Sequence, residues 1–392
     1  MVLERRGAPW GRALASRSLQ LGVVLLAAFV VAIPPTIHDP LPITGGGSTP
    51  ALGAAPPLLP AGVIGYVPVN ITNNESNATV HDFNERVVVN STYFRAWEEA
   101  HLRNVMFFDA QGTVVPSWLE SGGLNNSSSS IYWLNLSAGI PAHSTVTVYL
   151  GFGNLSSSAL MDGNWTGEAP TLSPHYGGLD DGSRVFPHYE NFASNDRQFK
   201  GVHRTGWYSS GGTGPYAYNH VQNGWLTDGV NGGGLEYVGS DFPVNRSVAV
   251  DLYVQDFQAV HGDWQAPFVL SRNATSFVPM GDVVRWSDQG APCNAFNSNA
   301  TFEVANYTTG RVLTNVSGRY PPGVFTVTDQ FVDEGYRAVL HHNGIISGSG
   351  YFATAVFSSW GCGSSFVGHW VRTRVLPPLG LMPVAVVGRT VL

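Results

Sequence analysis

Residues 337–346 read Arg-Ala-Val-Leu-His-His-Asn-Gly-Ile-Ile, and this stretch indicates how the chain is built. Asn343-Gly344 is typical of a type I′ turn, because both central positions of that turn need positive φ. The apolar residues on either side predict two antiparallel strands joined as a two-residue hairpin. The fold class is therefore expected to be all-β.

Short runs with apolar residues at every second position recur along the chain and are separated by turn residues. In the first half they lie at Val67–Ile71, Val87–Val89 and Thr145–Leu150. In the second half the expected strands are Ser247–Val254, Phe268–Leu270, Val283–Trp286, Val324–Val327, Tyr336–Leu340, Tyr351–Phe357 and Val367–Val375. The best candidate for a short helix is Tyr93–Leu102. These two blocks predict two β-sandwich domains.

The composition agrees with short strands and many turns. The 392 residues include 46 Gly and 25 Pro, and only 12% are charged. The formal net charge is −7, although four arginines fall within the first 17 residues, so the remainder is more acidic still. Such a surface repels nucleic acid, and no nucleic-acid partner is expected.

The N-terminal segment predicts export. Leu19–Ile33 is apolar except for Gln20, follows the arginines and ends before Pro34-Pro35. Residues 1–35 are therefore expected to be either a cleaved signal peptide or an uncleaved membrane anchor helix through residues 19–33. Since basic residues stay on the cytoplasmic side, the rest of the chain is expected to be extracellular or at the cell surface.

The expected domain boundaries follow breaks in the strand pattern. Residues 36–60 are rich in Pro and Gly and predict a linker, and residues 61–162 predict a small sandwich of the immunoglobulin-like or a similar type. Residues 163–182 lack apolar periodicity and predict a second linker. Residues 183–392 then form the second sandwich.

Sequons for N-glycosylation are dense in both halves and absent from the first 60 residues, which favours a glycoprotein. The candidate positions are Asn70, Asn77, Asn90, Asn126, Asn135, Asn154, Asn164, Asn245, Asn273, Asn299, Asn306 and Asn315. The alternative is a β protein that is simply rich in Asn, Ser and Thr.

The first block resembles a known family in the order of its motifs. Val67-Pro-Val-Asn-Ile71 is similar to the opening strand of the domain of unknown function 2341. Leu102–Asp109 and Val115–Glu120 are similar to its central strand pair, and Ile131–Leu134, Gly139–Ala142 and Thr147–Asn154 to its closing hairpin. The resemblance covers about residues 61–160. It implies a small surface sandwich of archaeal and bacterial proteins, without an assigned activity.

The second block resembles the concanavalin A-like lectin and glucanase (LamG-like) jelly rolls. Phe186–Phe192, Trp207, His220–Leu226 and His369–Arg374 are similar to the opening and closing strands of that family. This resemblance implies two facing sheets and a concave face that commonly binds glycans.

Exposed aromatic rings stack on sugars, because both present flat apolar faces. The candidate ligand-binding residues are Trp207, Tyr208, Tyr216, Trp264, Trp286 and Trp360; packing in the core is the alternative for each. Trp118, Trp133 and Trp370 lie inside patterned strands and are expected in the core.

Catalytic jelly rolls place two carboxylates on one face of a strand. Asp251 and Asp256 are five residues apart and point to opposite faces, so no catalytic residue and no enzyme activity is expected. No cofactor is expected, apart from calcium at Asp180, Asp181 or Asp282, for which turn capping is the stronger alternative.

The sequence thus favours a non-catalytic surface protein that binds glycans or other cell-surface components. The first alternative is a self-assembling structural subunit of an envelope or an extracellular filament, and a glycoside hydrolase is the second. The ligand, the assembly state and the fate of the N-terminal segment stay open.

Cys293 and Cys362 are expected to form one disulfide in the second sandwich. Pro292 precedes Cys293 and Gly residues flank Cys362, and these neighbours relax the backbone towards the tight bridging geometry. Such a bond would stabilise the fold by roughly 4 kcal/mol in the chain-entropy model. Thiol titration of the denatured, unreduced protein tests this prediction. Two titratable thiols per chain would instead identify both residues as separate buried thiols.

Overall fold

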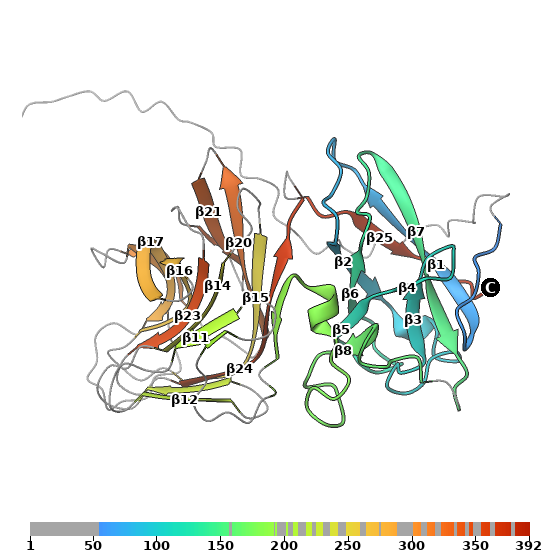
Figure 1. Ribbon diagram of the computed structural model, residues 1–392, viewed down its shortest axis with the longest axis horizontal. Helices are drawn as coiled ribbons and strands as arrows, with labels where there is room; N and C mark the ends of the chain where they lie inside the picture. The colour runs from blue at the N-terminus through green and yellow to red at the C-terminus, as the bar shows by residue number, and fades with distance from the viewer. Residues whose placement is uncertain are drawn as a thin grey trace, which may run out of the picture. The chain divides into compact units, whose positions relative to one another are not determined.

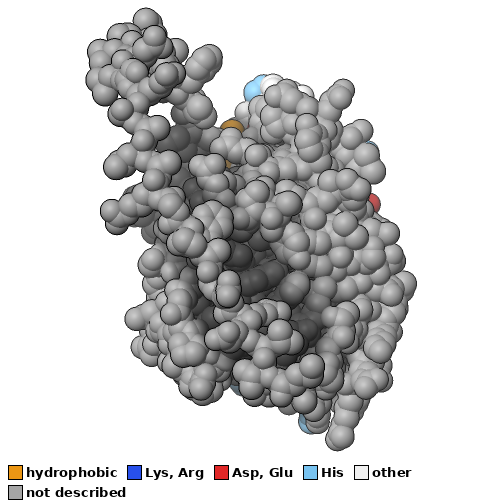
Figure 2. Space-filling view, turned by 90° about the vertical axis from the view of Figure 1, so that its left-hand side faces the viewer, with side chains coloured by type: hydrophobic (Ala, Val, Ile, Leu, Met, Phe, Trp, Pro, Cys, Tyr) orange, Lys and Arg blue, Asp and Glu red, His pale blue; other side chains and the backbone are white. Residues whose placement is uncertain are grey.

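The computed structural model describes residues 55–156, 159–191, 193, 369–377 and 381–392 in full. Between residues 201 and 375 it otherwise describes the backbone of the strands, with the side chains of Ala249, Asp251 and Tyr253. On the face shown in Figure 2, nearly all atoms belong to the remaining residues, and described side chains appear only at the edge. The described side chains therefore belong to the first sandwich and to the part of the second that contacts it.

The first sandwich consists of a five-stranded and a four-stranded sheet (Figure 1). In order, the five-stranded sheet contains β25 (Val384–Val387), β1 (Val63–Asn73), β7 (Ser144–Gly153), β3 (Val105–Phe108) and β4 (Val114–Val115). The four-stranded sheet contains β2 (Phe83–Val89), β6 (Ser130–Leu136), β5 (Ser117–Ser121) and β8 (Thr166–Glu168). All pairs are antiparallel except β5 with β8.

Alternating apolar residues build the core between these sheets. Val67, Val69 and Ile71 of β1 are fully buried, and so are Val87 and Val89 of β2. Period-two alternation sends every second side chain to the same face, so each strand contributes one row to the core. The three strands expected in the first half of the chain are confirmed.

The short helix expected over residues 93–102 is absent. The chain instead forms a 3-10 turn, η1 (Ser91–Tyr93), followed by turns. Asn104 explains the difference, because its buried amide donates to the carbonyl of Trp97 at 2.8 Å and accepts from the amide of Glu99 at 2.7 Å. These side-chain hydrogen bonds replace those of a helix.

The expected central pair and closing hairpin of the first sandwich also need correction. β3 pairs with β4 and β7, whereas β5 lies in the opposite sheet with β6. The consecutive strands β6 and β7 are likewise in different sheets. Gly139, with φ of +67°, lies at this crossing, and Ile140 is buried in the core, so the connection passes between the sheets instead of forming a hairpin.

The second sandwich has two eight-stranded antiparallel sheets, as expected of a concanavalin-like jelly roll. One contains, in order, β10 (Gly201–Val202), β11 (Trp207–Ser210), β14 (Glu236–Asp241), β23 (Thr354–Trp360), β16 (Trp264–Asn273), β17 (Ser276–Ser287), β18 (Thr301–Asn306) and β19 (Val312–Ser317). The other contains β12 (Ala217–Val221), β13 (Trp225–Gly229), β24 (Ser365–Val375), β15 (Val248–Gln258), β20 (Gly323–Val332), β21 (Gly335–His341) and β22 (Ile345–Ser347), with β9 (His188–Glu190) paired to β24.

The structure confirms the all-β fold class and every strand expected in the second half of the chain. It also confirms that β21 and β22 are paired around Asn343-Gly344. His341 is the partner of Ile345, so three residues, not two, connect the paired positions.

Two strands outside residues 61–162, the bounds expected for the first sandwich, pair with strands of that sandwich. Within residues 163–182, which were expected to be a linker, β8 pairs with β5 of the first sandwich. The C-terminal strand β25 follows the second sandwich in sequence but pairs with β1 (Figure 1). Residues 45–392 form one compact unit. Independent folding of the two sandwiches stays a prediction.

The described residues include one α-helix, α1 (Gly182–Val185), and no helix long and apolar enough to cross a bilayer. The expected signal or anchor at residues 1–35 and most of the expected linker at 36–60 lie outside the described residues. Export therefore stays a prediction.

Glu98 is a buried acid in the first sandwich, only 1% exposed. Burial raises the pKa of Glu98 to about 8, and a hydrogen bond from Ser91 opposes the shift only in part. The pKa of the buried Tyr132 is raised by its burial and by the negative charges of Glu98 and Glu168. The fold thus favours a neutral Glu98.

A raised pKa means that folding stabilises the protonated acid, so this stability is complete below the unfolded pKa and is lost as pH rises towards 8. Glu98→Gln should remove this loss, which amounts to roughly 4 kcal/mol between pH 4.5 and pH 8. Denaturant midpoints at both pH values measure the effect, with exposed Asp82→Asn as the control. Equal pH dependence in wild type and Glu98→Gln would contradict the prediction.

Candidate functional site

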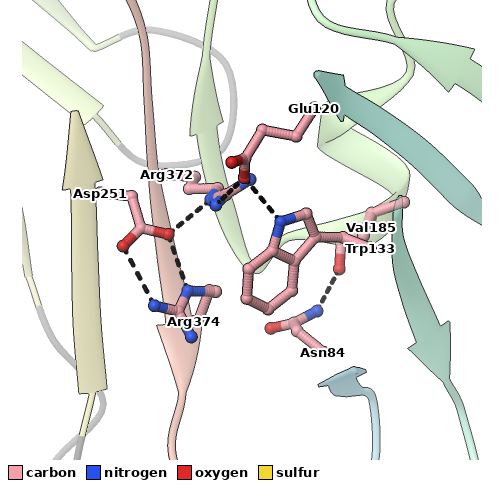
Figure 3. Close-up of polar contacts among 7 residues, drawn as sticks. All are labelled: Asn84, Glu120, Trp133, Val185, Asp251, Arg372 and Arg374. Atoms are coloured by element: carbon pink, nitrogen blue, oxygen red, sulfur yellow. Dashed lines mark hydrogen bonds and ion pairs between the residues drawn. The ribbon is translucent and has the colours of Figure 1, made fainter. Parts of the chain in front are cut away.

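A buried cluster of charges and rings joins strands of both sandwiches and is the most distinctive site in the described part of the chain (Figure 3). On β24, Trp370, Arg372 and Arg374 occupy alternate positions, so they face the same side. Asp251 on the neighbouring strand β15 is the cross-strand partner of Arg372. Strand register alone therefore places this acid beside the arginines.

Arg372 forms ion pairs with acids of both sandwiches. Its Nε lies 2.6 Å from Oδ2 of Asp251, and its Nη2 lies 2.5 Å from Oε2 of Glu120 on β5. Arg372 is 1% exposed and Asp251 is fully buried. Because a buried guanidinium needs paired carboxylates, the two ion pairs hold β24 against β5.

Arg374 and Trp133 complete the polar network. Arg374 donates to both oxygens of Asp251, at 2.7 and 3.1 Å. The indole Nε1 of Trp133 donates to Oε2 of Glu120 at 2.7 Å. Two arginines and two acids thus balance their charges inside the protein (Figure 3).

Four aromatic rings surround the Arg372 guanidinium. Its central carbon lies 4.5 Å from the ring centroid of Trp133, 4.6 Å from Phe186, 4.7 Å from Trp370 and 5.2 Å from Trp118. Ring faces attract cations, most strongly where water is excluded. The expectation that Trp118, Trp133 and Trp370 are core residues is confirmed, and their core is the one between the sandwiches.

The ion pairs determine the ionisation of this cluster. Burial alone would raise the pKa of Asp251, but the charges and hydrogen bonds of Arg374 and Arg372 hold it well below the ordinary value. Burial tends to lower the pKa of Arg372, and Glu120 and Asp251 reverse this and raise it. Both groups therefore stay charged over the ordinary range of pH.

Asp180 is a second, partly buried hub of hydrogen bonds beside this cluster. Its Oδ1 accepts from Nε1 of Trp118 at 2.8 Å and from the amide of Gly182 at 3.0 Å. Its Oδ2 accepts from the hydroxyl of Tyr189 at 2.8 Å and from the side-chain amide of Asn191 at 2.6 Å. Burial raises the pKa of Asp180, and these four hydrogen bonds oppose that shift.

Two of the three calcium candidates, Asp180 and Asp181, have described side chains. The four donors fill the acceptor directions of Asp180. Asp181 is 2% exposed and packs its carboxylate against Gly167, while the side chain of Asp282 lies outside the described residues. Among described side chains, no group of three acids, histidines or cysteines is placed to hold a metal. Calcium binding stays a prediction.

The six aromatic ligand candidates lie in the second sandwich, and their side chains are outside the described part of the chain. Backbone register still relates them: Trp264 of β16 is the cross-strand partner of Trp360 of β23. Trp207 and Tyr208 lie on β11 opposite Ser240 and Gly239, and Trp286 lies on β17 opposite Gln265 and Phe302. Tyr216, Cys293 and Cys362 fall outside the described residues.

Sequon asparagines of the first sandwich differ in exposure. Asn77, Asn126, Asn154 and Asn164 are exposed, and Asn70, Asn90 and Asn135 are partly buried. Asn135 donates to the carbonyl of Arg184 at 3.1 Å, so its side-chain nitrogen is occupied. The side chains of Asn245, Asn273, Asn299, Asn306 and Asn315 are outside the described residues.

The local sequence contains a signal for the Arg372 cluster that pattern reading alone missed. His369-Trp-Val-Arg-Thr-Arg374 places two arginines and a tryptophan at period two on one strand. Two charges on the same face as a core tryptophan require buried acidic partners. The Arg372 cluster has no exposed reactive group. Its role is structural, because its ion pairs hold strands together.

No family model matches the chain. "Uncharacterized protein 562" of Sulfolobus islandicus rod-shaped virus 1 is 25% identical over 344 residues, which cover 80% of this chain. The chain spans only 57% of that curated relative. The resemblance of residues 61–160 to the domain of unknown function 2341 therefore stays a prediction.

Several solved structures resemble about half of the chain. A beta-1,3-glucanase from Mycobacterium marinum has a TM-score of 0.30 and 10% identity, with 48% of this chain and 98% of that chain covered. The carbohydrate recognition domain of Emp46p has a TM-score of 0.33 and 7% identity, with 50% and 99% covered. An endo-1,3-beta-glucanase (laminarinase) domain from Thermotoga petrophila has a TM-score of 0.30 and 9% identity, with 48% and 96% covered.

Arg372→Met should lower the free energy of unfolding by about 3–5 kcal/mol, because it leaves Glu120 and part of Asp251 without a buried cationic partner. It should also speed protease cleavage within residues 163–182, which pack beside the cluster. Denaturant unfolding and timed proteolysis measure both effects. Arg389→Met is the matched control, since Arg389 lies over the exposed ring of Tyr93. A change no larger than the control would refute the role of the cluster.

Proposed function

We propose that this chain is a non-catalytic extracellular surface protein that binds glycans or other cell-surface components through its second sandwich. The observation that carries the proposal is the Arg372 cluster, which ties β24 of the second sandwich to β5 of the first. A second sandwich held in this way keeps a fixed orientation relative to the first, whereas a flexible linker would let it reorient. The first sandwich then serves as the support.

The proposed binding face is the sheet that contains β16 and β23. Trp264 and Trp360 are opposite each other on these neighbouring strands, and a pair of aromatic positions at this spacing suits the stacking of sugar rings. Tyr208 lies on β11 of the same sheet, two strands from β23. These aromatic positions are the residues that we propose contact the glycan.

The proposed location outside the cell rests on the N-terminal sequence and on the sequons. The basic residues followed by Leu19–Ile33 are typical of export. Four sequon asparagines in the first sandwich are exposed, as modification by a large glycan requires.

A structural subunit of an envelope or filament is the second candidate function. β25 is an edge strand of the five-stranded sheet, and Val384 and Val386 are 37% and 49% exposed. Exposed apolar edge strands pair readily with other chains. This feature favours assembly and is compatible with glycan binding by the other sandwich.

A glycoside hydrolase is the third candidate and is less favoured. A retaining mechanism needs two accessible carboxyl groups about 5–5.5 Å apart. Asp251, one of the acids of the second sandwich with a described side chain, is buried and paired with Arg372 and Arg374. It is therefore committed to the junction and unable to reach a substrate.

Trp264→Ala with Trp360→Ala should weaken binding to an insoluble polysaccharide by about tenfold or more, because each lost stacking contact is worth on the order of 1 kcal/mol. Pull-downs with insoluble β-glucan, chitin and immobilised mucin measure binding of residues 61–392. Trp165→Ala is the control, since Trp165 is an exposed tryptophan of the first sandwich. Binding to none of these probes or to a glycan array would count against the proposal, and release of reducing ends would support the hydrolase.

A further inference from the structure

The last twelve residues of the chain complete the first sandwich although they follow the second. We call Leu381–Leu392 the C-terminal clasp. Its strand β25 pairs with β1 through four residue pairs, from Val384 with Thr72 to Val387 with Val69. The clasp therefore occupies a place that the strands of residues 61–162 leave open at the edge of β1.

Main-chain hydrogen bonds extend this pairing beyond β25. The amide of Gly388 donates to the carbonyl of Pro68 at 2.8 Å, and Leu392 and Tyr66 exchange two bonds of 2.9 and 3.3 Å. At the other end, the amide of Leu381 donates to Oε1 of Glu75 at 2.9 Å. The clasp thus follows β1 from one end to the other.

Four apolar side chains of the clasp pack against the core but are only partly buried: Met382, Ala385, Val387 and Val391. Val384 and Val386 face outwards, and Leu381 and Leu392 are 48% and 55% exposed. The attachment therefore combines main-chain pairing on a sheet edge with a modest apolar contact, and another copy that brings the same strand can supply both.

The sequence of the connection between β24 and the clasp is compatible with pairing of the clasp to β1 of another copy. Leu376-Pro-Pro-Leu-Gly380 follows directly after β24. Consecutive prolines favour an extended connector, and the eight residues between Val375 and Val384 can span on the order of 27 Å. A connector with that reach would let the strand leave its own sandwich without unfolding β24.

We infer that the clasp is an exchangeable strand: the clasp of one copy of this chain can occupy the β1 edge of a second copy. The exchanged contacts are those already present within one chain, so the exchange needs no new complementarity. Reciprocal exchange gives closed dimers, and sequential exchange gives linear assemblies. The site that accepts the strand is the edge of β1, and its occupant is residues 381–392 of another copy.

Cross-linking between two full-length variants tests exchange. Asn70 and Val386 are cross-strand partners, and directly opposite Cα atoms in antiparallel strands are about 4.5–5.5 Å apart, which suits a disulfide. Chains with only Asn70→Cys are mixed at high concentration with chains with only Val386→Cys, warmed briefly and oxidised. We expect covalent heterodimers, with residues 70 and 386 linked in the peptide map.

The control mixture replaces Val386→Cys with Ala385→Cys, which keeps the added thiol on the clasp but turns it to the other face of the strand. It also measures any cross-links through Cys293 and Cys362. Heterodimers several-fold above this control support exchange. Heterodimers at the control level overturn it.

The pair Thr72→Cys and Val384→Cys, which are also cross-strand partners, repeats the experiment if a first variant does not fold. Neither mixture depends on a ligand. A failure of glycan binding therefore leaves this result unaffected, and a failure of exchange leaves the glycan proposal standing.

Discussion

The structure depends on one buried cation, the guanidinium of Arg372. Removing such a group from water costs several kcal/mol, and the cost is offset only where carboxylates and ring faces lie in fixed positions around it. Here Asp251, Glu120 and four aromatic rings supply those positions, and they come from strands of both sandwiches and from residue Phe186 between them. A shift of one sandwich against the other would leave a charge unpaired, so the cluster admits one arrangement.

Asp180 extends the same constraint to the segment between the sandwiches. It receives hydrogen bonds from Trp118 of the first sandwich and from Tyr189 of β9, which pairs with β24. The hydroxyl of Tyr176 lies 2.8 Å from the carbonyl oxygens of both Asn191 and His369. The residues around Asp180 and Tyr176 are therefore packed against both sandwiches. We expect this packing to limit movement of the second sandwich, which carries the proposed binding face.

The sequence predicted the strands well because alternation is a local property. Val67, Val69 and Ile71 needed only their own spacing to be recognised as core. The partners of Arg372 could not be found in this way, because Asp251 and Glu120 are 121 and 252 residues away along the chain. β25 escaped notice for a related reason: Val384-Ala-Val-Val387 is too short to be distinctive, and its pairing strand is at the other end of the chain. Asp180 was assigned by its residue type to calcium or a turn. It does accept from the amide of Gly182 two residues further on, as turn capping requires, but three side chains also donate to it, and these made it a hub that the local sequence could not predict.

The return of the C-terminus to β1 has a consequence for biosynthesis. Leu381 and Glu75, which are hydrogen-bonded, are 306 residues apart, so the sheet edge formed by β1 stays incomplete until the second sandwich has been synthesised as well. Contacts of such long sequence separation slow folding, because a large loop must close before they form. The first sandwich therefore reaches its final form only after the clasp has been synthesised, which couples its completion to that of the second sandwich.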